Sequence, residues 1–255
     1  MAKVIPILVD SGGSCGASSA STGAVLNVIQ HDSAEYLGLI EDHLEGRGVR
    51  FRYCRPFAGK SPLPREDGLG DGLILLGGGP WGSAGARDVP TLAAEVALAR
   101  AALAQDKPVV GIGLGAQILA LAAGGRSEPT PLSFEVGTAR RTGDQALNGY
   151  LPENYPLATY MRDWPVPPEH ADVLARDDKG RAVLWQVGRA AFGFAGHPGI
   201  KLAMVEDLIM EFEEGPGEIE PGLAQLRMAQ RSIEDALVPI MTGLVQITGW
   251  IRPPG

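Results

Sequence analysis

The sequence predicts an α/β fold with a mostly parallel central sheet, helices on both faces and a small antiparallel extension. In the first half, short apolar segments rich in Val, Ile and Leu alternate with helical segments, which is typical of a parallel sheet covered on both faces. After Gly125 this alternation gives way to shorter strands joined by proline-rich loops, which favours antiparallel pairing. The 255 residues suffice for one sizeable domain or two small ones.

Composition narrows the class of protein. Hydrophobic residues make up 45% of the chain and charged residues 20%, so we expect a soluble globular protein. The net charge of −8 and the lack of a basic stripe argue against nucleic-acid binding. No run approaches the roughly 20 apolar residues that span a bilayer, and the run 4–9 is too short for a signal-peptide core. Two cysteines, Cys15 and Cys54, suit a reducing compartment, so we expect a cytoplasmic location.

The first half of the chain is predicted to be a glycine- and serine-rich arm followed by regular elements. Residues 1–22 are predicted to be a flexible N-terminal arm. Ser33 can cap a helix through Leu44 that stops at Gly46. The other elements expected in this half are strands at 24–29, 49–53, 73–76 and 109–110, and helices at 92–104 and after Gly115.

The second half predicts a sheet extension and a helical tail. Strands are expected at 134–138, 182–187 and 190–194, with a helix over 200–213. The main domain is therefore predicted to span 23–213, and 214–255 is predicted to be a C-terminal helical tail interrupted by Pro239 and Gly243. The apolar stretch 237–251 either folds back onto the domain or faces another subunit, and the sequence leaves both open.

The turn from Gly111 to Gly115 follows Val109 and Val110 and opens an apolar helix. A strand, a tight glycine-flanked turn and a helix form the layout of a nucleophile elbow, in which the middle residue carries the attacking atom. The middle residue is Gly113, which has no side chain. This turn lies with other loops at the carboxyl ends of the strands, where α/β folds gather their ligands.

Four segments resemble the class I glutamine amidotransferases, in particular the GMP synthase-like members, which share a flavodoxin-like sheet. They are Ile29-Gln30-His31-Asp32, Leu75-Leu76-Gly77-Gly78-Gly79-Pro80, Gly111-Ile112-Gly113-Leu114-Gly115-Ala116-Gln117, and Phe192-Gly193-Phe194-Ala195-Gly196-His197-Pro198-Gly199. They stand in the family's order and span about 23–213. Together they predict the family's fold.

The resemblance also implies roles for three positions. In the family a Cys attacks the glutamine amide, a His handles protons, a Glu orients the His, and the ammonia goes to a partner synthetase. Here the Cys position is Gly113, the His is His197, and the Glu position is Gly199. The chain therefore resembles a catalytically inactive member, a pseudoenzyme serving as a scaffold or regulatory subunit of a metabolic enzyme complex. Its partner would be a synthetase, another metabolic enzyme subunit, or a second copy of the chain.

Some binding capacity could persist at this edge. Gly78, Gly79 and the amides after Gly113, starting at Leu114, could form an anion-binding nest for a small carboxylate. Gln117 would lie near that ligand or cap the helix. The four histidines and two cysteines show no metal-ligand spacing, and we expect neither metal nor cofactor.

Two other functions remain open from the sequence. One is a hydrolase or transferase acting on an amide or γ-glutamyl compound, with His197 as base and His31, Asp32 or Asp163 nearby. The other is a small-molecule sensor that keeps the pocket. Should a different acid orient the histidine, the candidates are Glu206 and Asp207 on the following helix.

Overall fold

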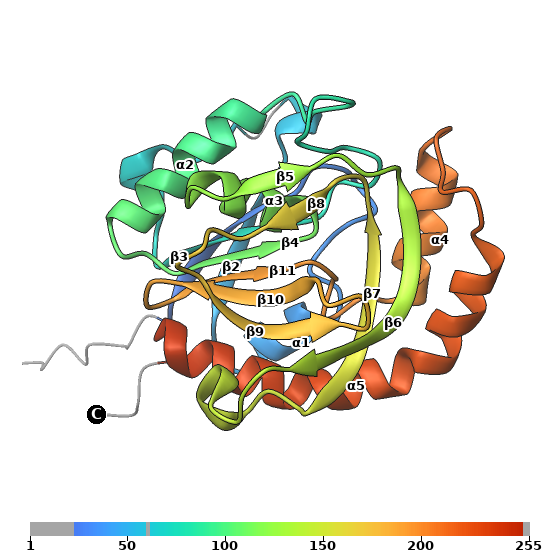
Figure 1. Ribbon diagram of the computed structural model, residues 1–255. Helices are drawn as coiled ribbons and strands as arrows, with labels where there is room; N and C mark the ends of the chain where they lie inside the picture. Colours follow the sequence, from blue (N-terminus) through green and yellow to red (C-terminus); the bar gives the residue numbers. More distant parts are fainter. Residues whose placement is uncertain (1–22, 60–61, 252–255) are drawn as a thin grey trace, which may run out of the picture.

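A nine-stranded mixed sheet forms the centre of the molecule (Figure 1). The computed structural model describes residues 23–59 and 62–251. The sheet order is β2-β1-β3-β4-β11-β10-β9-β6-β7, and a separate two-stranded sheet pairs β5 with β8. The strands are β1 (Val25–Ile29), β2 (Arg50–Cys54), β3 (Gly72–Leu75), β4 (Val109–Ile112), β5 (Arg126–Glu128), β6 (Ser133–Arg141), β7 (Asn154–Met161), β8 (Trp164–Val166), β9 (Asp172–Asp177), β10 (Ala182–Val187) and β11 (Ala191–Phe194).

Helices cover both faces of the sheet, as predicted. They are α1 (Leu39–Glu45), α2 (Leu92–Ala104), α3 (Leu114–Ala122), α4 (Leu202–Glu211) and α5 (Glu220–Thr248), with 3₁₀ turns η1 (Pro56–Ala58), η2 (Glu66–Gly68) and η3 (Ala146–Gly149). Alternate side chains of each central strand feed the two cores. Ile74 and Leu76 share one core with α1 and α5, whereas Leu73 and Leu75 share the other with α2 and α3.

The sheet divides into a parallel and an antiparallel half, which confirms the α/β class. Strands β2, β1, β3, β4 and β11 pair in parallel, and β10, β9, β6 and β7 continue antiparallel from β11. The antiparallel part is larger than expected because β7 and β9 are not evident in the sequence. Pro156 stands inside β7 at the sheet edge, and β9 carries charged residues at both ends.

The helix expected from Ser33 begins later than predicted, at Leu39. The Asp32 Oδ1 atom accepts the backbone N–H groups of Ala34 (2.9 Å) and Glu35 (2.7 Å), which turns the chain before a helix can form. Residues 33–38 therefore form an irregular segment between β1 and α1, and this segment shapes the candidate site.

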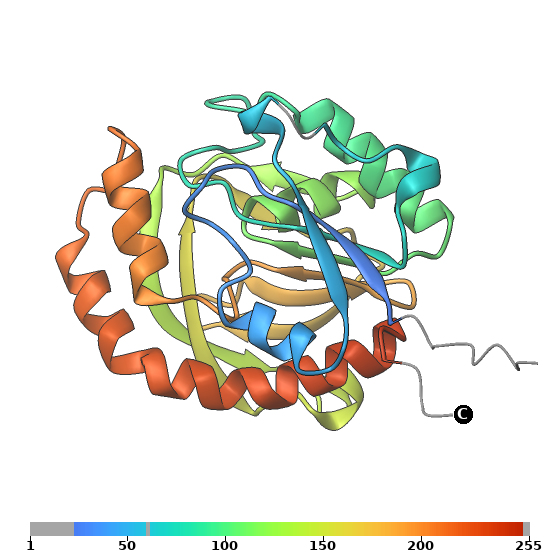
Figure 2. The same cartoon turned by 180° about the vertical axis from the view of Figure 1, so that it is seen from behind.

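The apolar C-terminal stretch folds back onto the domain along most of its length and leaves Val238 and Ile251 exposed. Helix α5 is 29 residues long and continues through Pro239 without a break. It lies alongside α1 in Figure 2. Leu237, Leu244 and Trp250 are buried in the same core as the central strands. The predicted boundary after residue 213 falls in the connection between α4 and α5. The predicted arm at 1–22, with Cys15, lies outside the described residues.

Within the described part of the chain, no helix is both long and apolar enough to cross a membrane.

Candidate functional site

The predicted elbow is present where β4 meets α3. Gly113 adopts φ 56° and ψ −115°, a conformation that strains any residue with a side chain. Its N–H donates to the Phe194 carbonyl of the neighbouring strand β11 (2.9 Å). A Cβ built on Gly113 would meet the Gly77 Cα at 3.4 Å, which is ordinary contact. The turn therefore keeps the shape of an elbow and has space to begin a side chain, but it carries no reactive atom.

Both nitrogens of the His197 ring are hydrogen-bonded to backbone groups. The Gly199 N–H donates to Nδ1 (3.1 Å), so Nδ1 carries a lone pair and Nε2 donates its hydrogen to the Tyr36 carbonyl (2.9 Å). Burial lowers the pKa of His197 to about 4, so the ring is neutral near pH 7. A neutral ring in this tautomer has no free lone pair with which to take a proton.

The position where the resemblance expects the triad Glu has no room for one. A Cβ built on Gly199 would lie 2.9 Å from the Ile40 Cγ1 and 3.0 Å from the Ile40 nitrogen. The Gly199 carbonyl also accepts the Leu39 N–H at the start of α1 (2.8 Å). The beginning of α1 thus fills the space that a side chain at 199 would need.

The glycine loop after β3 is occupied by groups of the chain itself. The buried Glu35 Oε2 accepts the Gly79 N–H at 2.5 Å, and a Cβ on Gly77 would lie 2.1 Å from Glu35 Oε1. A Cβ on Gly78 would lie 2.5 Å from the Leu114 Cδ2. The carboxylate-binding nest predicted for this loop therefore already contains a carboxyl group, that of Glu35.

Buried charges surround this loop. His31 donates Nδ1–H to the Gly77 carbonyl and Nε2–H to the Glu95 carboxylate, both at 2.8 Å. Burial by itself would lower the pKa of His31, but the Glu95 carboxylate and the Gly77 carbonyl together raise it to about 9. Burial raises the pKa of Glu35 to about 8, with a further contribution from the nearby Asp32 charge. At neutral pH His31 is therefore charged, and Glu35 keeps much of its proton.

Asp32 has one satisfied and one unsatisfied oxygen. Its Oδ1 accepts two backbone N–H groups, while the buried Oδ2 has no hydrogen-bond partner among the described residues. Burial raises the pKa of Asp32 to about 6, and Glu211 adds to the rise. The segment before α1 thus places two destabilised carboxyl groups, Asp32 and Glu35, against the glycine loop.

Gln117 is buried and links three segments of the chain through its side-chain amide. Its Nε2 donates to the Arg162 carbonyl (2.7 Å), and its Oε1 accepts the Ser83 hydroxyl (2.7 Å). Asp163 completes this network by accepting the N–H groups of Ser83 and Ala84, each at 2.9 Å. The network joins α3 to the loop after β3 and to the start of β8.

The structure does not assemble the partners considered for a His197 base. His31 is bonded to Glu95 and Gly77, and Asp163 is bonded to the loop after β3. Glu206 is exposed on α4 and lies 3.7 Å from Arg227. Across residues 23–59 and 62–251, no thiol or hydroxyl is hydrogen-bonded to the His197 ring.

Glu35 and Glu95 are the site residues that sequence reasoning missed. Each is a charged residue in a helical or polar context, and only the folded structure shows that it is buried. A clue is available in the segment Gln30 to Glu35, where four titratable or amide side chains crowd between an apolar strand and Leu37. Within the described ranges, no group of three or more His, Cys, Asp or Glu residues is placed to hold a metal ion.

Comparisons with known proteins agree with this fold. A glutamine amidotransferase from Methylobacillus flagellatus is 23% identical and has a TM-score of 0.75, with 91% of this chain and 97% of that chain covered. A glutamine amidotransferase from Thermotoga maritima is 20% identical, with a TM-score of 0.74 and coverage of 89% and 98%. A protein from Thermoplasma acidophilum, described as part of a candidate GMP synthase, is 17% identical, with a TM-score of 0.51 and coverage of 82% and 98%.

A search of curated proteins finds no match to the chain. The family model described as "Glutamine amidotransferase class-I" matches residues 39–179, which is more than half of the chain. The chain belongs to the class I glutamine amidotransferase family.

Proposed function

We propose that this chain is a class I glutamine amidotransferase-like pseudoenzyme that acts as a non-catalytic scaffold or regulatory subunit of a metabolic enzyme complex. The proposal depends on one observation about His197 and Gly113. Both ring nitrogens of His197 are hydrogen-bonded to backbone groups, and Gly113, the middle residue of the elbow, has no side chain. Hydrolysis of an amide by this family's route needs a nucleophile and a base within hydrogen-bond reach of each other. Gly113 supplies no nucleophile, and His197 is not free to be the base.

The filled glycine loop supports the same proposal. A developing oxyanion needs unoccupied N–H donors aimed at it. The Gly79 N–H is bonded to Glu35, and the Leu114 side chain covers Gly78. The Gly79 N–H could donate to a substrate oxygen only if the Glu35 carboxyl group released it.

The partner is proposed on the family's mode of action. Class I amidotransferase domains pass ammonia to a synthetase, and one structure similar in fold is described as part of a candidate GMP synthase. An inactive member that keeps the fold would retain the docking surface and lose the chemistry. We propose that the partner is a synthetase or a related enzyme, or a second copy of the chain, and that the location is cytoplasmic, in keeping with the use of cysteine.

The first test measures ammonia release from glutamine by the purified wild-type chain, with an active class I amidotransferase as positive control. We expect no release above that of buffer. Turnover above buffer that tracks the protein through purification would overturn the inactive assignment.

The second arm is affinity purification from native cells followed by mass determination of the intact complex. We expect a defined assembly, either with a metabolic enzyme or as a homo-oligomer. A lone monomer under the same conditions would contradict the scaffold role, even if the glutaminase assay remained negative.

A further inference from the structure

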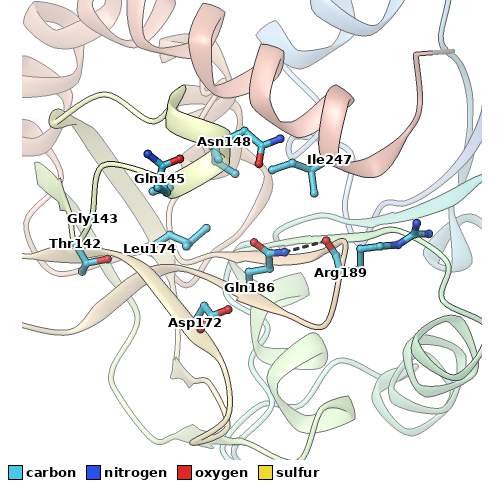
Figure 3. Close-up of a pocket in the computed structure, with 11 residues that line it drawn as sticks. Thr142, Gly143, Gln145, Asn148, Asp172, Leu174, Gln186, Arg189 and Ile247 are labelled. Atoms are coloured by element: carbon cyan, nitrogen blue, oxygen red, sulfur yellow. Dashed lines mark hydrogen bonds between the residues drawn. The ribbon is translucent and has the colours of Figure 1, made fainter. Parts of the chain in front are cut away.

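The cavity drawn in Figure 3 lies at the opposite edge of the sheet from the elbow. Gln186 lies near the end of β10 and Arg189 lies in the turn that leads into β11. The first residue of β11, Ala191, pairs with Val109 at the start of β4. Gly113 follows the last residue of β4. The volume of about 510 Å³ is within the range of small-molecule pockets.

A strained turn forms one rim of this cavity. Leu147 (φ 49°, ψ 47°) and Asn148 (φ 57°, ψ 33°) are consecutive non-glycine residues in the left-handed region, and Gly149 follows with φ 82°. Such a conformation costs about 1–2 kcal/mol per ordinary residue and persists only when the surroundings impose it. Strain of this kind is concentrated at ligand clamps and functional sites.

Helix α5 holds the strained turn in place. The Leu147 side chain is buried in the core beneath α5, and a Cβ on Gly243 would lie 2.7 Å from the Leu147 carbonyl oxygen. A glycine inside a helix costs about 1 kcal/mol relative to alanine. The left-handed turn and the glycine inside α5 thus belong to one contact, between Gly243 and Leu147, which fixes the position of Asn148 at the rim.

The lining chemistry limits what the cavity can bind. Its polar side chains are mainly amides and a hydroxyl, from Thr142, Gln145, Asn148 and Gln186. The Thr142 hydroxyl and the Gln186 amide nitrogen already donate to backbone carbonyls, so these two side chains offer acceptor oxygens, whereas Gln145 and Asn148 offer both donors and acceptors. The Arg189 side chain extends away from Leu174 and Gln186 in Figure 3, and its carbonyl oxygen accepts Gln186 Nε2 at 2.9 Å. Among the described residues that line the cavity, Arg189 is the cation and Asp172 is the carboxylate, so the lining carries one charge of each sign.

Amides and hydroxyls both donate and accept hydrogen bonds, and so do the hydroxyl groups of sugars. Leu174 and Ile247 give the cavity an apolar surface suited to the C–H face of such a ring, and the described lining includes no aromatic side chain on which a nucleobase could stack. We propose that this cavity is a binding site for a small uncharged carbohydrate, preorganised by the strained turn. The proposal is independent of the inactive elbow.

The test follows the side-chain amide NMR signals of the isotope-labelled full chain during titration with glucose, galactose, maltose and sucrose. The Gln145→Ala and Asn148→Gly variants assign the two rim amides. We expect saturable shifts of these signals with at least one sugar. Because Gly accepts the left-handed conformation, Asn148→Gly removes the amide without adding strain, and we expect it to weaken that binding about tenfold, as loss of one good hydrogen bond would.

The matched control is Gln246→Ala, which removes an exposed amide of α5 that is not part of the lining and should leave the affinity unchanged. Titrations with adenosine and citrate complete the set. The proposal is overturned if no sugar gives saturable shifts, if Asn148→Gly binds as wild type does, or if adenosine or citrate binds at these residues in place of the sugars.

Discussion

Glu35 is the residue whose side chain occupies the glycine loop after β3, which would otherwise be free to bind a ligand. Its carboxyl group is buried, bonded to the Gly79 N–H and close to Asp32. Burial favours the protonated form of this carboxyl group and outweighs the opposing effects of the Gly79 hydrogen bond and the His31 charge, so the pKa of Glu35 rises from 4.5 to about 8. The site is therefore filled by a group that is neutral at low pH and becomes a destabilising charge as the pH rises.

The pH dependence of stability follows from this shift. Between pH 4.5 and about 8 the folded state holds a proton on Glu35 that the unfolded chain has lost, so the free energy of unfolding falls as the pH rises through this window. Glu35→Gln keeps an oxygen acceptor for Gly79 but cannot ionise. We expect urea denaturation at pH 5.5 and 8.5 to show a smaller loss of stability in Glu35→Gln than in wild type.

The matched control for that measurement is Glu153→Gln, which changes an exposed carboxylate. It should reproduce the wild-type loss of stability between the two pH values. Equal losses in wild type and Glu35→Gln would show that Glu35 is already ionised in the folded protein, and the description of the filled loop would be wrong.

At the scale of the elements, the spacing of apolar residues predicts helices and strands more accurately than it predicts the segments that connect them. The helix at 92–104 and the strand at 182–187 were predicted with the boundaries that the structure shows, because both present a simple apolar pattern. The predicted start of α1 at Ser33 is wrong. The Asp32 side chain accepts the backbone N–H groups of Ala34 and Glu35, and these hydrogen bonds form a turn where the helix was expected to begin. Strand β7 was missed because Pro156 is tolerated at a sheet edge, where its missing donor costs little.

Helix α5 carries an element-scale prediction. Gly243→Ala would gain about 1 kcal/mol of helix propensity but would place a methyl group 2.7 Å from the Leu147 carbonyl oxygen. Overpacking of this kind costs about 1–3 kcal/mol, so we expect a net loss of stability of about 1 kcal/mol and a lower Tm. Thermal unfolding followed by circular dichroism checks this.

Ser232→Ala, at an exposed position of the same helix, is the control and should raise the stability slightly through propensity alone. If Gly243→Ala is as stabilising as Ser232→Ala, then α5 does not press on the strained turn.

At the scale of the whole molecule, the sequence predicts where the candidate site lies but does not show which side chains occupy it. The order of four motifs and the carboxyl ends of the parallel strands predict that Gly113, the glycine loop and His197 lie at one end of the parallel strands. Which hydrogen bonds the His197 ring makes depends on Tyr36, 161 residues away in the chain, and the burial of Glu35 depends on the irregular path before α1. Contacts of this range leave no periodic pattern in the sequence.

The C-terminal segment shows the same difference between periodic patterns, which the sequence reveals, and long-range contacts, which it does not. Apolar residues at helical spacing predicted a helix in 223–247, but the pattern could not say which surface it covers. In the structure α5 packs beside α1 and on the antiparallel half of the sheet, so a segment for which the sequence leaves both core and interface open contributes to the core.

The reactivity of a thiol introduced by Gly113→Cys tests most directly whether His197 is free to act as a base. The alkylation rate of the peptide containing position 113 would be measured by mass spectrometry from pH 5 to 10, with thermal unfolding to verify that the variant is folded. The N-terminus of α3 lowers the pKa of a thiol at position 113 whatever His197 does, so the same profile is measured for the Gly113→Cys, His197→Asn double variant. Because both nitrogens of His197 are hydrogen-bonded to backbone groups, we predict that the two profiles coincide. A profile that moves to higher pH when His197 is replaced, the mark of a thiolate paired with an imidazolium, would contradict the proposed inactivity.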